Sequence, residues 1–391
     1  MRVAALQSAE WLNRPETQAI FAALDGHKRR TRAVGGVVRD SILERLRDST
    51  DIDLATELLP ADVIARASAA GIATYPTGID HGTVTLKLGD TLAEVTTLRQ
   101  DIETDGRHAV VAFGTDWRMD ASRRDFTLNA LYCADDGTLY DPLAGIEDAL
   151  NGRVRFIGDA SQRIAEDGLR VYRFFRFSAS HGGQQYDPDG LAASRDAVHR
   201  LDHLSAERVG SELMRMLALP AVAGTLAVMS EIGLLEASEP VLRQLLAYEA
   251  IGGRAPLGRL AILASGQPET VQERWRLSKD VVKGARAIAL SADLLVRDKI
   301  GEAAYRYGEA AVDGLAVAAA SDRWSRDHLA EAAREMARLR IPELPVSGHD
   351  LTGLGLAPGP ALGQQLARLE EAWIESDFTL ARDDLLALVE R

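Results

Sequence analysis

The chain has 391 residues with a formal net charge of −13 at pH 7, and 46% of its residues are hydrophobic. This length and apolar content exclude a disordered chain and a single compact core, and they predict two to four domains. The single cysteine, Cys133, excludes an intrachain disulfide and an all-cysteine zinc site, and no 18-residue apolar run is present that could span a membrane. We therefore expect a cytoplasmic protein.

The first fifty residues predict a turn that binds phosphate. A helix is expected near residues 10–25, and a short strand then leads into Gly35 and Gly36. Two adjacent glycines let the backbone come close to a bulky ligand. The helix predicted over residues 37–46 would offer its unpaired N–H groups to an anion.

Two aspartates after this turn predict a metal site. Asp51 and Asp53 flank one residue of a predicted strand, so both carboxylates point to the same face. Such a pair suits divalent cations, which can activate a hydroxyl and neutralise a departing pyrophosphate. The alternative is a strand–loop junction with two solvated carboxylates. Glu94, on a neighbouring predicted strand, is either a third ligand or an exposed strand residue.

The rest of the first 145 residues mixes helices and strands. The apolar pattern predicts a helix at 61–70 and strands at 72–75, 83–88 and 91–98. The polar, non-periodic segment 101–120 is expected to be a mobile surface loop. A helix is predicted to follow it, over residues 122–131.

After residue 145 the pattern is almost entirely helical. Candidate helices with short glycine or proline separators cover residues 161–178, 205–217, 221–232, 241–250, 259–264 and 280–296, and more follow. This order predicts an α/β head on a long helical body.

A pair of arginines before an apolar segment indicates an anion nearby. Arg123 and Arg124 precede Asp125 at the expected start of the 122–131 helix. The helix dipole disfavours cations at that end, and a bound triphosphate would explain their presence. The alternative is a charge cluster without function.

Charged residues in the 163–176 segment could read a base. On one continuous helix, an arc about 120° wide would hold Arg163, Glu166, Asp167, Arg170 and Arg173. The Asp167 carboxylate could accept from an exocyclic amine, and Arg170 could donate to ring nitrogens and carbonyls. The alternative is a solvated face with i,i+3 salt bridges.

Five motifs in order over about the first 215 residues give the chain a family resemblance. They are Gly35-Gly36-x-Val38-Arg39-Asp40, Asp51-x-Asp53-Leu54-Ala55-Thr56, Arg123-Arg124-Asp125-Phe126-Thr127-x-Asn129-Ala130, Glu166-Asp167-x-x-Arg170 and Glu207-Arg208-x-x-x-Glu212-Leu213. Together they resemble the class II tRNA nucleotidyltransferase and bacterial poly(A) polymerase family, within the DNA polymerase beta superfamily.

The resemblance implies an α+β fold. An N-terminal nucleotidyltransferase head, with a small mixed β-sheet and helices, would be followed by an all-helical neck, body and tail. The implied boundaries are 1–145 for the head, 146–220 for the neck with its base-recognition helix, 221–300 for the body and 301–391 for the tRNA-binding tail. The 101–120 segment would take the place of the family's flexible loop.

The resemblance also implies an activity and a set of site residues. The activity is template-independent addition of C, C and A to the 3′ end of tRNA, using CTP, ATP and Mg²⁺. Asp51 and Asp53 would be the catalytic metal ligands, and Asp167 and Arg170 would pair with the incoming base. Phosphate and sugar contacts would come from Gly36, Arg39, Arg124, Arg173 and Arg176.

The motifs leave alternatives open. A poly(A) polymerase, or an enzyme that adds only CC or only A, would carry the same motifs, although the acidic end at residues 383–391 favours tRNA over poly(A) addition. A silent RNA-binding protein would be expected to lose Asp51 and Asp53. The acidic net charge is a weak argument against RNA, because a local basic stripe can hold phosphates. No such stripe stands out after residue 180, and residues 274–276 are only a candidate tRNA contact.

Overall fold

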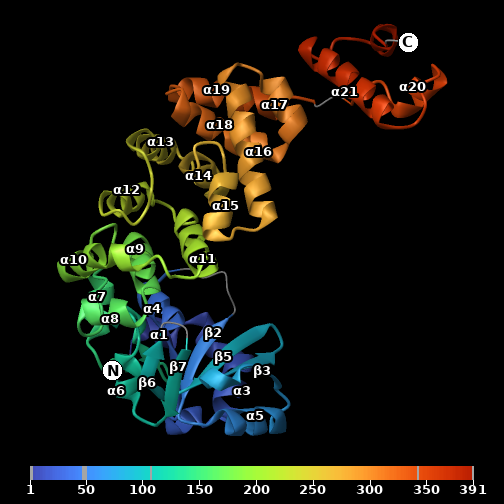
Figure 1. Cartoon of the computed structure of the whole chain (residues 1–391). Coiled ribbons are helices and arrows are strands. Elements are labelled where there is room, and N and C mark those ends of the chain that lie inside the picture. Colours follow the sequence, from blue (N-terminus) through green and yellow to red (C-terminus); the bar gives the residue numbers. More distant parts are fainter. Residues whose placement is uncertain (1–2, 46–50, 106–107, 341–342, 390–391) are drawn as a thin grey trace. The chain divides into compact units, whose positions relative to one another are not determined.

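The computed structural model describes residues 3–45, 51–105, 108–340 and 343–389 (Figure 1). The chain divides into two compact units, Met1–Met216 with Val228–Glu236 and Leu217–Ala227 with Ala237–Arg391. Within the described ranges no helix has the length and apolar character needed to cross a bilayer. The α+β fold class is confirmed, since a small mixed sheet near the N-terminus is followed by helices.

The described residues of the first unit form a seven-stranded sheet. Its strands, in spatial order, are β3 (Ala73–Gly78), β4 (Thr83–Leu88), β5 (Thr91–Thr97), β2 (Ile52–Thr56), β1 (Thr31–Val34), β8 (Tyr132–Cys133) and β9 (Leu139–Tyr140). The β2 and β5 strands are parallel, and the other neighbours are antiparallel. The parallel pair places residues of two separate chain segments side by side at the same height, which is what positions the carboxylates of the site.

Short helices accompany this sheet. They are α1 (Ala4–Gln7), α2 (Glu10–Asn13), α3 (Pro15–Ala23), α4 (Gly36–Ile42), α5 (Pro60–Ala69), α6 (Trp117–Ser122) and α7 (Gly145–Leu150), with 3₁₀ turns at Gly26–Lys28, Ile79–His81 and Thr127–Asn129. The single helix expected near residues 10–25 is divided at Arg14, whose backbone is extended. Pro15 causes the break, because the residue before a proline is disfavoured in helical conformation.

The prediction of a mobile loop over residues 101–120 is wrong for most of that range. Arg99–Asp105 (β6) and His108–Phe113 (β7) form an antiparallel hairpin with a register shift between Asp101 and Glu103. The β6 sequence is polar and lacks the alternation that identifies a half-buried strand, so its pattern does not predict a strand. The tip, residues 106–107, lies outside the described residues.

The predicted helix over residues 122–131 is also wrong. The helix lies earlier, as α6, where the Asp116 side chain accepts hydrogen bonds from the N–H groups of Arg118 and Met119. After α6 the chain turns and bends over residues 123–125 and is extended at Phe126, which forms a β-bridge with Phe156. This long-range pairing overrides the local helical pattern.

The helix expected over residues 161–178 is two helices. They are α8 (Ala160–Glu166) and α9 (Leu169–His181), and Asp167 between them has an extended backbone. The Asp167 carboxylate accepts from the Leu169 N–H at 3.1 Å, which caps the start of α9. A Cβ at Gly168 would lie 2.7 Å from the end of the Leu201 side chain, so a larger residue here would require Leu201 to move. The helices that follow are α10 (Pro188–Ala197), the 3₁₀ turn Val198–Arg200, α11 (Ala206–Leu217) and α12 (Ala223–Glu231), and α12 contributes residues to both units.

The second unit is helical throughout its described residues. Its helices are α13 (Glu239–Ala250), α14 (Pro256–Leu263), α15 (Glu269–Trp275), α16 (Lys279–Val296), α17 (Ile300–Tyr307), α18 (Glu309–Ser321), α19 (Arg326–Arg338), α20 (Gly348–Gly353), α21 (Pro360–Glu375) and α22 (Arg382–Ala387). The last three helices share a small core around Trp373, against which Tyr305 of α17 packs.

Candidate active site

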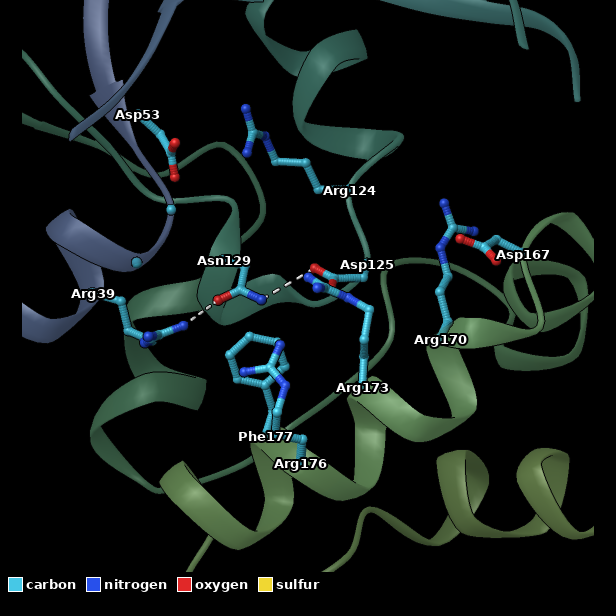
Figure 2. Close-up of a pocket in the computed structure, with 12 residues that line it drawn as sticks. Arg39, Asp53, Arg124, Asp125, Asn129, Asp167, Arg170, Arg173, Arg176 and Phe177 are labelled. Carbon is cyan, nitrogen blue, oxygen red and sulfur yellow. Dashed lines mark hydrogen bonds and ion pairs between the residues drawn. The ribbon is translucent and has the colours of Figure 1, made fainter. Parts of the chain in front are cut away.

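One open pocket in the first unit, with a volume of about 420 Å³, gathers the motif residues (Figure 2). It is lined by Gly35, Gly36, Arg39, Asp53, Arg124, Asp125, Asn129, Asp167, Arg170, Arg173, Arg176 and Phe177. The structure thus brings together every residue for which the sequence suggested a nucleotide contact, from β2, α4, α9 and the segment after α6. Of the two suggested metal ligands, Asp53 lines the pocket, and Asp51 directly precedes the same strand.

The glycine turn connects β1 to α4 at one edge of this pocket. Gly35 has φ +74°, a conformation that favours glycine, and its N–H donates to the carbonyl oxygen of Leu131. A side chain at Gly35 would also come within 3.8 Å of the Asn129 carbonyl oxygen. Gly36 begins α4, so the turn brings bare backbone and the helix start to the pocket wall.

Three carboxylates, those of Asp51, Asp53 and Glu94, lie close to one another at the start of β2 and on the neighbouring strand β5. Asp53 and Glu94 are register partners on the parallel strands. Their side chains and that of Asp51 are exposed. Although the Glu94 side chain is exposed, the surrounding protein removes part of its hydration and so raises its pKa, and the charges of Asp53 and Asp51 raise that pKa further. This repulsion shows that negative charge is concentrated here, as a cation site requires.

The donor set fits a divalent cation that is also held by its substrate. Among the described residues, no group of three or more Asp, Glu, His or Cys side chains is close enough to hold a metal alone. Mg²⁺ is usually bound by one or two protein carboxylates together with waters and substrate phosphates. Asp51 and Asp53 meet that requirement, and Glu94 remains a candidate third ligand.

A chain of hydrogen bonds links the α4 side of the pocket to α9. Arg39 donates to the Asn129 side-chain oxygen, and Asn129 in turn donates to Asp125 at 3.1 Å. Arg173 completes the chain by donating to the other Asp125 oxygen through Nε, at 2.8 Å. Burial would raise the pKa of Asp125, but the Arg173 charge and the donated hydrogen bonds outweigh it and lower that pKa. Phe177 lies beneath the Arg39 and Arg173 guanidinium groups, 5.2 and 5.4 Å from its ring centre.

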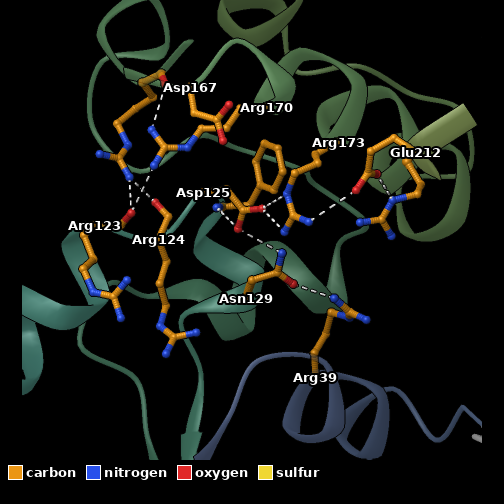
Figure 3. A network of polar contacts seen from close by, with 12 residues as sticks. Arg39, Arg123, Arg124, Asp125, Asn129, Asp167, Arg170, Arg173 and Glu212 are labelled. Atoms are coloured by element: carbon orange, nitrogen blue, oxygen red, sulfur yellow. Dashed lines mark hydrogen bonds and ion pairs between the residues drawn. The ribbon is translucent and has the colours of Figure 1, made fainter. Parts of the chain in front are cut away.

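Glu212 of α11 holds two of the pocket arginines from behind (Figure 3). It lies 2.5 Å from the Arg176 Nε and 3.7 Å from Arg173, and it is 3% exposed. Arg215 is a third, solvent-facing partner at 3.5 Å. A buried carboxylate thus fixes two of the three guanidinium groups, those of Arg173 and Arg176, that α9 presents to the pocket.

A second buried carboxylate, Asp120, fixes Arg124. Asp120 pairs with Arg123 at 2.7 Å and with Arg124 at 3.3 Å, and it accepts a hydrogen bond from the Tyr132 hydroxyl at 2.9 Å. The expectation that Arg163 lies on a charged helix face is wrong. Its side chain is buried, and it donates to the backbone carbonyl of Arg124 at 2.6 Å. Its role in this structure is to hold the segment that carries the arginine pair.

The suggested base-reading pair lies at the helix break rather than along one helix face. Asp167 pairs with Arg208 of α11 at 2.7 Å, and Arg170 pairs with Glu166 at 2.7 Å. Both residues still line the pocket, and Figure 2 shows them together on its α9 side. Because the helix is broken at Asp167, its carboxylate does not lie on a helix face and instead points toward the start of α9.

Sequence reasoning missed three lining residues, namely Asp125, Asn129 and Phe177. Asp125 and Asn129 stand four residues apart within one motif, but the helix predicted there gives neither a role in the pocket. Two polar residues at that spacing are the signal that could have found them. Phe177 follows Arg176 directly and looks like an ordinary core residue in the sequence.

Two family models match the chain. The "Poly A polymerase head domain" matches residues 31–155, and the "Probable RNA and SrmB-binding site of polymerase A" matches residues 185–246. The mitochondrial CCA tRNA nucleotidyltransferase 1 of Danio rerio is 34% identical, over 91% of this chain and 86% of its own length. The CCA-adding enzyme of Limosilactobacillus fermentum is 33% identical, over 88% of both chains.

The chain belongs to the CCA-adding enzyme family of tRNA nucleotidyltransferases. A solved CCA-adding enzyme of Bacillus stearothermophilus, in complex with CTP, has a TM-score of 0.77 and 30% identity, covering 93% of this chain and 94% of that one. A Thermotoga maritima CCA-adding enzyme complexed with tRNA shares the fold, with a TM-score of 0.66 at 16% identity. Membership of this nucleotidyltransferase family implies dependence on a divalent metal.

Proposed function

We propose that this CCA-adding family member extends the tRNA 3′ end by C, C and A, taking the nucleotides from CTP and ATP and releasing pyrophosphate. The observation that carries the proposal is the pocket that joins the carboxylate edge of β2, the glycine turn before α4 and the arginines of α9. That combination supplies metal ligands, a phosphate-binding turn and cations for a triphosphate within one cavity.

In this proposal the chain's own residues orient the reactants. Asp51 and Asp53 would hold Mg²⁺, which supplies activation of the attacking hydroxyl and charge neutralisation of the leaving pyrophosphate. Gly36 leaves room for the nucleotide phosphates beside α4. Arg39, Arg124, Arg173 and Arg176 would stabilise the negative charge on the triphosphate, because they are already held in place by buried carboxylates and amides.

Nucleotide choice is assigned to Asp167 and Arg170. Cytosine and adenine each carry an exocyclic amine that can donate to a carboxylate, and uracil and guanine present a carbonyl at that position. Both side chains line the pocket, and each has a second partner, Arg208 or Glu166, that restricts its orientation. An Asp167→Ala variant should therefore accept UTP and GTP more readily, whereas unchanged nucleotide preference would contradict base reading.

The same motifs would serve poly(A) addition, or addition of CC or A alone. CCA addition is favoured because relatives at 30% identity or more, over most of the chain, carry that name. The cytoplasmic location stays a prediction, since relatives of that name include mitochondrial enzymes.

The decisive experiment is primer extension on a tRNA transcript that lacks its 3′ CCA. Given CTP and ATP with Mg²⁺, the product should be three nucleotides longer, and two, one or many added nucleotides would identify the alternatives. Asp53→Asn should lower the rate about 1,000-fold, because metal assistance is worth several kcal/mol. Asp62→Asn, an exposed position on α5, is the matched control and should stay within about twofold of wild type. Full activity in Asp53→Asn, or loss of its fold by circular dichroism, would contradict the metal role.

A further inference from the structure

A cationic stripe lies on the second unit at the start of α16. Lys279, Lys283 and Arg286 are exposed, and on a helix of 3.6 residues per turn they fall within an arc of about 60°. Arg276, in the loop just before the helix, is also exposed and adopts a left-handed backbone with φ +47°. Trp275, which precedes it, is 5% exposed and anchors the loop in the core.

Most of the stripe is not neutralised by neighbouring acids. Arg286 pairs with Glu269 at 2.7 Å. Arg276, Lys279 and Lys283 form no ion pair within the described ranges of the chain. The arginines of the pocket in the first unit differ from these residues, because Arg124, Arg173 and Arg176 are each paired with a carboxylate. The stripe therefore presents net positive charge to solvent on a chain whose overall net charge is −13.

This arrangement opposes the stability of the helix that carries it. Cations in the first turn are disfavoured by the helix dipole, and like charges four residues apart, such as Lys279 and Lys283, repel each other. Asp280 supplies the acidic residue of the first turn, beside the Ser278 cap that accepts from the Val281 N–H. A position that costs stability and gains no partner among the described residues is best explained by a ligand of opposite charge.

We infer that this stripe, Arg276 with Lys279, Lys283 and Arg286, binds phosphates of the tRNA backbone. The inference rests on the proposed function, which makes tRNA the substrate, and it adds a surface that binds it. Three separate cations along about two helical turns suit successive phosphates, which need charge and no base contact. A protein partner would call for an aromatic or other apolar anchor at the centre of the patch. The tryptophan beside the stripe is buried, and Leu290, an exposed apolar residue on the same helix face, lies one turn beyond Arg286, at the end of the stripe.

The test compares tRNA binding by a Lys279→Glu/Lys283→Glu double variant with that of wild type over a range of salt concentrations. The dissociation constant at low salt should rise at least tenfold, and the slope of log affinity against log salt should become shallower by about 0.7–0.9 for each lost phosphate contact. The KM for CTP, measured at saturating tRNA, should stay unchanged because the pocket lies in the other unit. The melting temperature should not fall, since the substitutions relieve the dipole conflict.

A matched control separates a local contact from the change in net charge. Arg243→Glu/Lys299→Glu makes the same charge change in the same unit, at exposed residues that pair with Glu239 and Glu302 on or beside their own helices. An equal loss of affinity in this control, or an unchanged slope in the stripe variant, would overturn the inference. If wild type binds tRNA through the stripe but fails to extend it, the proposed function is wrong and the stripe is supported. If wild type extends tRNA and the stripe variant binds it unaltered, the proposed function is supported and the stripe is wrong.

Discussion

Two arginines, Arg259 in the helical second unit and Arg173 in the candidate nucleotide pocket, show that an arginine paired with an acid can be either enclosed by the fold or open to a cavity. Arg259 is 0% exposed. It donates to the carbonyl oxygens of Leu217 and Leu219 at 2.6 Å each and pairs with Glu249 at 2.9 Å. Arg173 also pairs with a carboxylate, Asp125, at 2.5 Å, yet its side chain is 30% exposed and lines a cavity.

The difference lies in where the remaining donors and acceptors point. Glu249 also accepts from the N–H groups of Val222 and Ala223, so the Arg259–Glu249 pair closes both sides of the turn before α12. All of these partners are inside the fold, and the Arg259 Nε, which has no hydrogen-bond partner among the described residues, is buried as well, so a ligand cannot reach it. Arg173 keeps part of its guanidinium facing the pocket, where it can take a phosphate as a further partner. Pairing with an acid therefore does not decide the role of an arginine, whereas access to the cavity does.

The largest expected effect comes from removing the structural arginine. Arg259→Met should lower the free energy of unfolding by about 3–5 kcal/mol, because it leaves several buried carbonyl groups without their donor and Glu249 without its cation, with only two backbone N–H groups as partners. Urea denaturation followed by circular dichroism measures it. Arg243→Met, which breaks an exposed pair with Glu239 in the same unit, should cost less than about 0.5 kcal/mol. Equal effects of the two substitutions would show that the buried Arg259 pair stabilises the fold no more than an exposed pair, and the structural role given to Arg259 would be wrong.

The second prediction concerns Arg173, whose loss should lower activity much more than stability. Arg173→Met should lower kcat/KM for CTP about 100-fold, as expected for loss of one fixed charge that stabilises a reacting phosphate. Its cost in stability should be only about 1–2 kcal/mol, since Asp125 keeps hydrogen bonds from Asn129 and from the Phe126 N–H. Steady-state kinetics on a tRNA ending in its discriminator base gives the first quantity.

Arg215→Met is the control for Arg173, because Arg215 pairs with the same Glu212 but is 62% exposed and does not line the pocket. Its kcat/KM should remain within about twofold of wild type. A comparable loss of activity in both variants would place the effect in the Glu212 ion pairs rather than in contact with the nucleotide.

Much of this organisation could be predicted from the sequence because the decisive signals are local. Period-two alternation at β4 and β5 and the spacing of Asp51 and Asp53 depend on neighbouring residues alone. The glycine turn at Gly35 and the switch to helices after residue 145 are signals of the same kind. The motif order then identified the family, and the residues singled out for the nucleotide do line one pocket.

The errors arose where distant contacts decide the structure. Phe126 lies inside the predicted helix but is extended and pairs with Phe156, thirty residues later, and Gly168, beside the break at Asp167, lies close to Leu201 of a later segment. Neither partner is implied by local pattern. The same limit hid the buried Arg163 and the ion pairs at Glu212, since helical spacing cannot say which face meets another segment. Tertiary contacts, rather than propensity, therefore set the details of the site.

The smallest expected effect concerns the contact between His181, the last residue of α9, and Asp40 of α4. His181 lies 3.1 Å from Asp40, the residue that also pairs with Arg39 at 2.8 Å. Burial lowers the pKa of His181 below its usual value and outweighs the hydrogen bond to Asp40, and the nearby charges of Arg39 and Arg45 add to the decrease. The folded protein should therefore hold His181 neutral at pH 7, donating its Nε2–H to Asp40.

This lowered pKa gives the pH dependence a definite sign. Below about pH 6.5, the unfolded chain protonates this histidine while the folded protein resists, so stability is lost as pH falls from there through the folded pKa. His181→Gln keeps a donor for Asp40 but does not titrate. The stability of wild type relative to this variant, from urea unfolding at each pH, should thus decline between about pH 7.5 and pH 5. A relative gain on acidification would mean that Asp40 holds an imidazolium instead, and that Arg39 shares its carboxylate with a second cation rather than with a neutral donor.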